Sequence, residues 1–573
     1  MKFSEFAKFL ERLEKTSSRL AITDILAELF KASDISEIDK VVYLSLGSLA
    51  PNYKGIVFNL ADQMMMRAIA ESFKIDLEKV KKTYKEKGDL GEVSFVLSNN
   101  KDKNLSVNEI YEKLLTAAKE GGEGSQERRV TIISEILKLV DPLSAKFITR
   151  IPVGKLRLGF SEKTIIDALA LMKNGDKSGS KEIENAYNIS PDIGLIAKLV
   201  KEKGTKNIDK IVKPVVGIPV VPMLAQRLKS PAEMIKKMGT VSVEPKYDGL
   251  RIFIHFKSPN TIRIFTRNMN FIDESIFPEL KNLGKYIKAN EVILDSEAVG
   301  INLEEEKILD FQATMQRRRK HEVKENASKT PLQFQVFDIL LKNGKSLINI
   351  PYLERRKELQ KTIPTKNPLL NIDEYTITDN PKDIEDLYKK YIKDGLEGIL
   401  VKKTTGEYVS GRTGWNWVKM KEEESARGKL SDTVDCVVMG YSVGKGKRVG
   451  FGIGQFLVGV LDESGEQSRT IKTVTKVGTG LTDAEFHELK ARLLKLTVQE
   501  KPKEYLVNKI LEPDFWVTPS LVVELAADDI TKSPNHTAGF ALRFPRLVKF
   551  RDDKAVKDAT TLKEVEKLYK LQK

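Results

Sequence analysis

The residues best suited to chemistry lie in the stretch EPKYDGLRIF, at residues 244–253. Lys246 is followed by Asp248, Gly249 and Arg251, and a glycine lets the backbone approach a ligand closely. An unprotonated lysine amine can attack carbonyl carbon or phosphorus, and burial or neighbouring cations lower the lysine pKa toward that state. Four-residue patterns recur by chance, so this stretch alone favours an ordinary surface lysine.

More charged and aromatic residues follow in separate strand-like stretches: FTRN, LDSEAVG, QVFDIL, DGLEGILVKK, GWNWVKMK and LRFPR. Cations neutralise phosphates, carboxylates bind a hard metal or ribose hydroxyls, and an aromatic ring stacks on a base. The ordered set therefore predicts a site for a nucleoside triphosphate with Mg²⁺. Its members are Arg267, Asp295, Glu297, Phe337, Asp338, Glu397, Lys402, Lys419, Lys421, Arg543 and Arg546.

Each member also has a plain structural interpretation. Phe337 alone is most simply a core residue, and Glu297 alone is most simply an ion-pair partner. Lys419 and Lys421 alone could lie on an exposed strand face. The occurrence of all these residues in one order favours the nucleotide site over the separate structural interpretations.

Three regions that differ in composition and in the spacing of their apolar residues must position these groups. Residues 1–215 carry apolar residues at three- and four-residue spacing, as in FAKFLERL and ITDILAELF, and predict an all-α domain. The Pro- and Val-rich KPVVGIPVVPMLAQ predicts a linker, after which residues 216–425 alternate as strands with helices between them and predict an α+β domain. Residues 426–573 hold short strands with Gly-rich turns and predict a small β-barrel of the OB-fold type.

Composition narrows the class of protein. The 573 residues carry a net charge of +15, spread along the chain, which favours a large surface for a polyanion such as nucleic acid. There is no apolar run of membrane-spanning length and no signal-peptide pattern, so we expect a cytoplasmic protein with no membrane partner. The one cysteine, Cys436, excludes an internal disulfide and a four-Cys zinc site, and its apolar context predicts a core position.

The sequence leaves two interpretations open for one stretch of the helical region. IPVGKLRLGF, at residues 151–160, combines glycines with Lys155 and Arg157. It could bring backbone and cations close to a phosphate, or it could be a tight connection between two helices.

The ordered set KYDGLR, FTRN, LDSEAVG, FDIL, LEGILVK, WVKMK and LRFPR resembles the signature of covalent nucleotidyltransferases. It is most similar to the ATP-dependent DNA ligases of the type shared by archaea and eukaryotes. The resemblance covers nearly the whole chain, because LAPNYKGIVFNL and IPVGKLRLGFSEKTIIDALA look like the helical DNA-binding domain of that family. It implies a DNA-binding domain at residues 1–215, an adenylation domain at 216–425 and an OB-fold domain at 426–573.

The function implied by the resemblance is the sealing of nicks in double-stranded DNA, in replication, repair and recombination. ATP would be the nucleotide and Mg²⁺ the metal. Lys246 would form a phosphoramidate with AMP, Glu244 would bind at the adenine side, and Phe337 would stack on adenine. Arg251 and Arg267 would contact phosphate and ribose.

The remaining roles concern the metal and the phosphates. Glu297 would bind the ribose and, with Glu397, the metal. The α-phosphate and the departing pyrophosphate would be held by Lys402, Lys419, Lys421, Arg543 and Arg546. Family members carry an arginine where this chain has Thr413, and Arg412, one place earlier, could supply that contact.

Three other classes fit part of the pattern. NAD-dependent ligases carry a four-Cys zinc site, which one cysteine cannot form. RNA guanylyltransferases and RNA ligases share the lysine motif but leave the first 215 residues unexplained. A non-catalytic DNA scaffold would be expected to lose one of the reactive residues, which are all present. We expect a monomer. No QxxIxxFF-like box is found, so the sequence leaves a sliding-clamp partner open but gives it no support.

Overall fold

The computed structural model covers residues 1–573 and separates into two compact units, Met1–Lys421 and Glu422–Lys573. It describes every residue except 59, 157, 303–306, 310–313, 315–316, 318–329, 365–366, 412–413, 422–432, 444–451, 464–469, 479–480 and 572–573. The boundary predicted at residue 215 lies inside the first unit and stays a prediction. Within the described part of the chain, no helix combines the length and apolar character that a membrane crossing requires.

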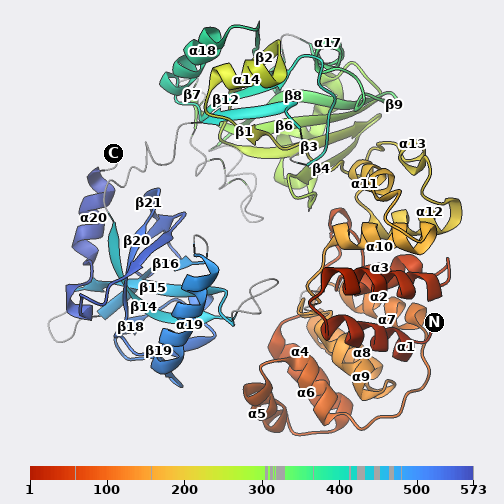
Figure 1. The fold of residues 1–573 in the computed structure, drawn as a ribbon, viewed down its shortest axis with the longest axis vertical. Helices are drawn as coiled ribbons and strands as arrows, with labels where there is room; N and C mark the ends of the chain where they lie inside the picture. Colours follow the sequence, from red (N-terminus) through yellow and green to blue (C-terminus); the bar gives the residue numbers. More distant parts are fainter. Residues whose placement is uncertain are drawn as a thin grey trace. The chain divides into compact units, whose positions relative to one another are not determined.

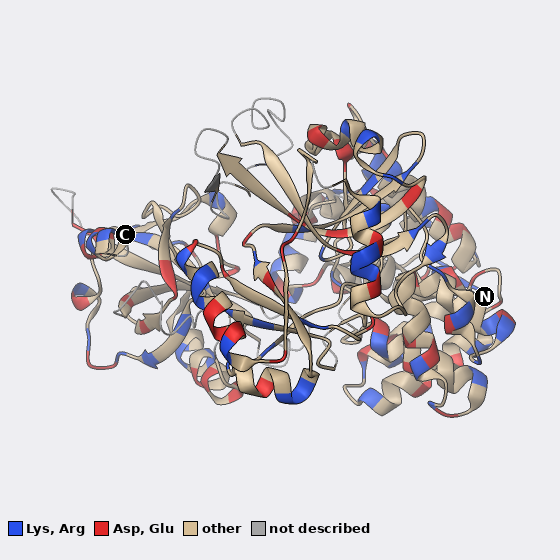
Figure 2. Cartoon of the chain, turned by 90° about the horizontal axis from the view of Figure 1, so that it is seen from above, with Lys and Arg blue, Asp and Glu red and all other residues tan. Residues whose placement is uncertain are grey.

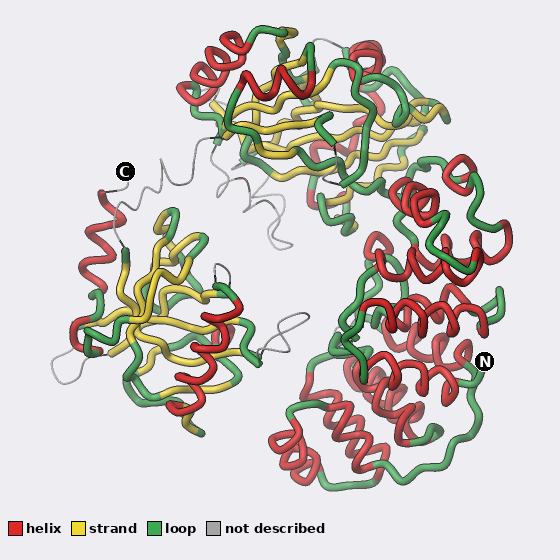
Figure 3. The backbone as a smooth tube through the Cα atoms, viewed as in Figure 1, coloured by secondary structure: helices red, strands yellow, loops and turns green. Residues whose placement is uncertain are grey.

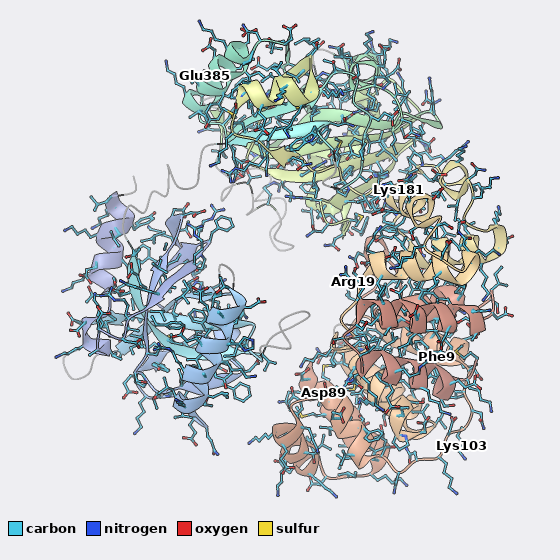
Figure 4. The ribbon with its side chains drawn as sticks, viewed as in Figure 1. Phe9, Arg19, Asp89, Lys103, Lys181 and Glu385 are labelled. Carbon is cyan, nitrogen blue, oxygen red and sulfur yellow. The ribbon has the colours of Figure 1, made fainter. Side chains whose placement is uncertain are left out.

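The first unit begins with the helical region that the apolar spacing predicts (Figure 1). In the first helix, Phe6, Leu10 and Leu13 share one face and are fully buried. Further along, Asp89, which is labelled in Figure 4, caps a helix. Its carboxylate also accepts a hydrogen bond from Arg150 Nε at 3.0 Å. The helices are α1 (Phe3–Glu14), α2 (Arg19–Ala32), α3 (Ile38–Ser45), η1 (Asn52–Lys54), α4 (Asp62–Phe73), α5 (Leu77–Lys87), α6 (Leu90–Leu97), α7 (Val107–Lys119), α8 (Ser125–Lys138), α9 (Pro142–Arg150), α10 (Glu162–Asn174), α11 (Ser180–Ile189), α12 (Ile193–Lys203) and α13 (Ile208–Ile211).

The stretch at residues 151–160 connects α9 to α10. Lys155 Nζ lies 2.6 Å from the carboxylate of Asp62, and Arg157 lies outside the described residues. The stretch is thus a connection between two helices, and a phosphate contact of this stretch stays a prediction.

The Pro- and Val-rich stretch that follows α13 is packed in its second half, although Val215 is 50% exposed. Val220 and Met223 are buried, in one cluster with Phe253 and Trp417. The predicted linker therefore contributes to the core of the region that follows it.

Two sheets, with helices between some of their strands, make up the rest of the first unit (Figure 3). One has the order β1-β13-β12-β2-β11, and the other has β10-β8-β6-β3-β4-β5 as its main path. The chain passes from the first sheet to the second between Lys246 and Leu250, and passes back between β10 and β11. Both crossings place polar residues where the two sheets meet.

The elements of this region are β1 (Gln226–Arg227), α14 (Pro231–Met238), β2 (Val241–Lys246), β3 (Leu250–Lys257), β4 (Thr261–Thr266), β5 (Phe271–Ile272), η2 (Glu274–Ile276), η3 (Pro278–Tyr286), β6 (Glu291–Asn302), β7 (Lys307–Ile308), β8 (Leu332–Lys342), β9 (Lys345–Ser346), α17 (Tyr352–Thr362), β10 (Leu370–Ile372), β11 (Thr376–Thr378), α18 (Pro381–Lys393), β12 (Gly398–Lys403) and β13 (Trp417–Lys421).

The second unit is rich in strands, as the Gly-punctuated pattern predicts. The long strand β14 pairs antiparallel with β15 along one edge and with β19 and β20 along the other. Cys436 lies on β14 and is fully buried, which confirms its predicted core position.

The elements of the second unit are β14 (Val434–Ser442), β15 (Gln455–Asp462), β16 (Thr470–Val477), α19 (Asp483–Leu496), β17 (Thr497–Val498), β18 (Tyr505–Leu506), η5 (Lys509–Leu511), β19 (Phe515–Val517), β20 (Val522–Ala526), β21 (Asp529–Lys532), β22 (Phe540–Arg543), β23 (Arg546–Phe550), η6 (Val556–Asp558) and α20 (Leu562–Leu571).

Candidate active site

A cavity of about 760 Å³ lies in the first unit and takes residues from both sheets. Its lining includes the predicted residues Lys246, Arg251, Arg267, Glu297, Phe337 and Lys419. Residues that lie far apart in the sequence are thus brought together around one space large enough for a small-molecule ligand.

Lys246 is the last residue of β2, and its side chain points into this cavity with 24 % of its surface exposed. Its Nζ donates a hydrogen bond to the Glu397 carboxylate and lies 3.4 Å from the Tyr247 carbonyl oxygen. The backbone N–H of Glu397 donates to the Lys246 carbonyl at 3.0 Å, which fixes the two residues side by side. Burial acts to raise the pKa of Glu397, but the neighbouring Lys246 outweighs it and the pKa lies below its ordinary value.

Gly249 makes the crossing from β2 to β3 possible. A Cβ at this position would lie 2.4 Å from the Ala298 carbonyl oxygen, closer than any side chain tolerates. The turn after Lys246 therefore requires glycine, and this explains the spacing of the KYDG motif.

Arg251 and Glu297 lie directly opposite each other on the neighbouring strands β3 and β6. Two guanidinium nitrogens of Arg251 contact both carboxylate oxygens of Asp295, at 2.7 and 3.0 Å. The hydroxyl of Tyr408 donates to the same carboxylate at 2.8 Å, so the guanidinium is held in one orientation. Burial raises the pKa of Glu297 to about 7, although Lys246 and Arg251 favour its charged form.

Aromatic rings form the wall of the cavity beside Arg251. Phe337 and Trp417 both line it, with ring centroids 5.9 Å apart at 76°. The Arg251 guanidinium lies 5.5 Å from the centre of the Phe337 ring. Such a surface suits the flat face of a base.

Lys402 and Glu244 form a fully buried ion pair that does not line the cavity. Lys402 Nζ lies 2.5 Å from Glu244 Oε2 and also donates to the Phe337 carbonyl at 2.9 Å. The other oxygen of Glu244 accepts hydrogen bonds from the hydroxyls of Tyr352 and Ser242. The sequence implies a phosphate contact for Lys402 and an adenine contact for Glu244. In this structure the two side chains form an ion pair with each other, and the implied contacts stay predictions.

The remaining cations differ in position. Arg267 and Lys419 line the cavity, and burial together with the nearby Lys246 lowers the pKa of Lys419. Lys421 Nζ lies 3.4 Å from Glu397. Arg412 lies outside the described residues.

Comparison with known proteins matches all three regions of the chain. Residues 2–170 match the family described as "DNA ligase N terminus", residues 222–421 match "ATP dependent DNA ligase domain", and residues 450–554 match "ATP dependent DNA ligase C terminal region". A "Probable DNA ligase" of Dictyoglomus turgidum is 40% identical over 100% of this chain and 98% of its own length. The chain belongs to the ATP-dependent DNA ligase family.

More distant relatives agree with this family. "DNA ligase 1" of Methanosarcina mazei is 37% identical over 99% of each chain. A solved structure titled "Pmar-Lig_Pre." is similar in fold, with a TM-score of 0.53 at 19% identity over 96% of this chain and 99% of that one. The protein is thus an ATP-dependent DNA ligase with a helical N-terminal domain, a nucleotidyltransferase domain and a β-rich C-terminal domain. It seals nicks through an adenylate intermediate, uses ATP and Mg²⁺, and has DNA as its substrate.

Two predicted residues of the ligase lie in its second unit. Arg546 Nη2 lies 2.9 Å from the Asp528 carboxylate, and the Arg543 guanidinium lies 5.3 Å from the centre of the Phe544 ring. Because the two units are separate bodies, the structure describes these arginines only within their own unit.

Sequence reasoning missed three residues that shape the site: Tyr408, Trp417 and Asp373. Trp417 stands inside the quoted stretch GWNWVKMK, where its place directly before the strand lysines was a usable signal. Tyr408 and Asp373 lie in stretches with no recognisable pattern, and only the folded chain brings them to the site.

Proposed function

We propose that Lys246 is the residue of this ligase that carries AMP. The supporting observation is its position on the lining of the cavity, which the aromatic rings and two further cations, Arg267 and Lys419, also line. The Nζ lone pair would attack the α-phosphorus of ATP. A P–N bond would form while the bond between the α-phosphorus and the oxygen that bridges it to the β-phosphate breaks. Pyrophosphate would leave with the electron pair of that bond.

The other residues of the cavity would act by positioning and by neutralising charge. Phe337 would stack on the base, Arg251 would contact ribose and phosphate in the orientation set by Asp295, and Lys419 would contact the α-phosphate. AMP then passes to the 5′-phosphate at a nick, and the 3′-hydroxyl displaces it to seal the strand.

Mg²⁺ fits the carboxylates of the site, Glu297 in the cavity and Glu397 beside Lys246. Carboxylate oxygens are the donors that this cation prefers. Within the described residues, no group of three or more His, Cys, Asp or Glu side chains is placed to hold a metal, so phosphate oxygens would supply further ligands. When bound, the cation neutralises charge on the phosphates.

We also propose a division of labour along the chain: residues 1–215 bind DNA, residues 216–425 adenylylate, and residues 426–573 form an OB-fold. The paired strands β14, β15 and β16 with the return through β20 support that barrel. Lys and Arg are distributed over the part of the chain that the structure describes, as Figure 2 shows, which suits contacts to many phosphates of nicked duplex DNA. Arg543 and Arg546 would orient pyrophosphate. A monomeric state, a cytoplasmic location and a clamp partner stay predictions of the sequence.

Covalent labelling tests this proposal. The full chain is given α-labelled ATP, α-labelled GTP or adenylate-labelled NAD with Mg²⁺, and then denatured. Label from ATP alone, removed by nicked duplex as the nick is sealed, is the expected result. Label from GTP alone, or no label from any of them, would contradict the proposal.

A further inference from the structure

Tyr53 belongs to η1 in the helical region, but its ring packs into the core of the nucleotidyltransferase region. It is buried in the same apolar cluster as Phe337 and Trp417, the aromatic rings that line the nucleotide cavity. Its ring meets the ring of Phe265 on β4 edge to face, with the centroids 6.5 Å apart at 86°. Tyr53 is therefore a point at which the helical region contacts the sheet of the nucleotide site.

The hydroxyl of Tyr53 anchors this ring to the helical region. It donates a hydrogen bond to Asp192 Oδ2 at 3.0 Å, and Asp192 is the N-cap of α12, where it also accepts from the Leu195 N–H at 3.0 Å. The hydroxyl of Tyr43 on α3 donates to the other oxygen of the same carboxylate. Asp192 thus joins η1 to two helices, and the ring of Tyr53 is held in place from that side.

Phe265 stands at the start of the turn that carries Arg267 to the cavity. Phe265 and Phe271 are paired on β4 and β5, and their ring centroids lie 6.1 Å apart. Residues 266–270, between them, all line the cavity. Met269 in this turn has a φ of 61°, which a residue with a side chain rarely adopts and which persists only where the surrounding structure holds it. The turn therefore depends on the packing of the two phenylalanines at its base.

We propose that Tyr53 is a positioning residue for the reaction with ATP: by packing against Phe265 it holds the β4–β5 turn and so sets the place of Arg267 in the cavity. Tyr53 itself is not among the described residues that line the cavity, so it acts only through the turn. The helical region thus contributes to adenylylation as well as to DNA binding. This inference rests on the proposed function, because it assumes that Arg267 contacts the nucleotide.

A double-variant cycle tests whether Tyr53 acts through Arg267. The rate of covalent labelling by α-labelled ATP is measured for the full chain as Tyr53→Ala, as Arg267→Ala and as the double variant. Tyr53→Ala should lower kcat/KM for labelling about tenfold, because a misplacement of about 1 Å at a reacting site can cost about 100-fold. In the Arg267→Ala background the same change should lower the rate by less than about twofold, since the residue that Tyr53 positions is already gone.

Further variants separate positioning from folding. Tyr53→Phe keeps the ring contact with Phe265 and should restore most of the labelling rate. Tyr53→Leu fills more of the space than alanine and replaces Tyr53→Ala in the cycle if that variant does not fold. Its matched control is Tyr43→Leu, which removes the other tyrosine of the same carboxylate but lies in the helical core. Tyr43→Leu should lower the melting temperature without slowing labelling of the folded chain.

Four results would overturn the inference. The first is an equal loss from the Tyr53 change in both backgrounds, which would mean that it weakens the fold and does not act through Arg267. The second is a wild-type labelling rate in Tyr53→Ala or, if that variant does not fold, in Tyr53→Leu. The third is an equal loss of labelling in Tyr43→Leu and Tyr53→Leu. The fourth is a wild-type rate in Arg267→Ala, which would leave Tyr53 nothing to position. A wild-type chain that accepts no label from ATP would instead contradict the proposed function itself.

Discussion

Replacing Lys402 with methionine should destabilise the nucleotidyltransferase region by about 3–5 kcal/mol. Both members of the Lys402–Glu244 pair are fully buried, and Lys402 Nζ also bonds the Phe337 carbonyl. Methionine would fill most of the space but would leave the Glu244 carboxylate buried without its cation. Removing one partner of a buried pair is costly for this reason, more than for the lost attraction.

The double variant Lys402→Met/Glu244→Gln should recover most of that loss, because no uncompensated charge is then buried. Urea unfolding followed by tryptophan fluorescence measures both variants. Two of the three tryptophans, Trp415 and Trp417, lie in this region, and the Trp417 ring centre is 4.8 Å from Lys402 Nζ. Unfolding of Lys402→Met at the wild-type urea concentration, combined with a large loss of labelling by ATP, would refute the structural role and favour the phosphate contact.

Other predictions concern pH, the arginine network and salt. Burial lowers the pKa of His255 to about 3, so as the pH falls below its ordinary 6.5 the unfolded chain binds a proton that the folded chain does not. The free energy of unfolding of the wild-type protein should therefore fall by about 2 kcal/mol between pH 7 and 5. Its melting temperature should fall more steeply over this range than that of His255→Asn, and parallel curves would contradict this. Tyr408→Phe removes the hydroxyl that donates to Asp295, and should raise KM for ATP about fivefold while affinity for nicked duplex stays unchanged; an equal loss of DNA affinity would count against it. Affinity for nicked duplex should fall steeply with added salt while labelling by ATP changes little, and a salt-independent affinity would argue against phosphate contacts.

The order of residue types along the chain was enough to predict the ligase family and the groups around Lys246. The residue types at the ends of strands carry that information. Gly249 is an example, because the backbone crossing from β2 to β3 leaves no room for a side chain at this position. The burial of Lys402 could not be predicted, because β12 is covered on both faces and its sequence has no period that separates inward from outward residues. Asp373 could not be found because its place depends on where the chain crosses between sheets. The sequence predicts a linker for the Pro- and Val-rich stretch because the residues that it packs against, such as Phe253, belong to strands that follow it in the sequence.

The central claim is that Lys246 carries AMP, and peptide mass spectrometry after labelling tests it most directly. The chain is incubated with ATP and Mg²⁺ without DNA, digested, and searched for the added AMP mass. The account predicts one modified peptide, with AMP on Lys246, and none from Lys246→Ala. AMP on Lys419 or Lys421, or an adduct that persists in Lys246→Ala, would contradict it.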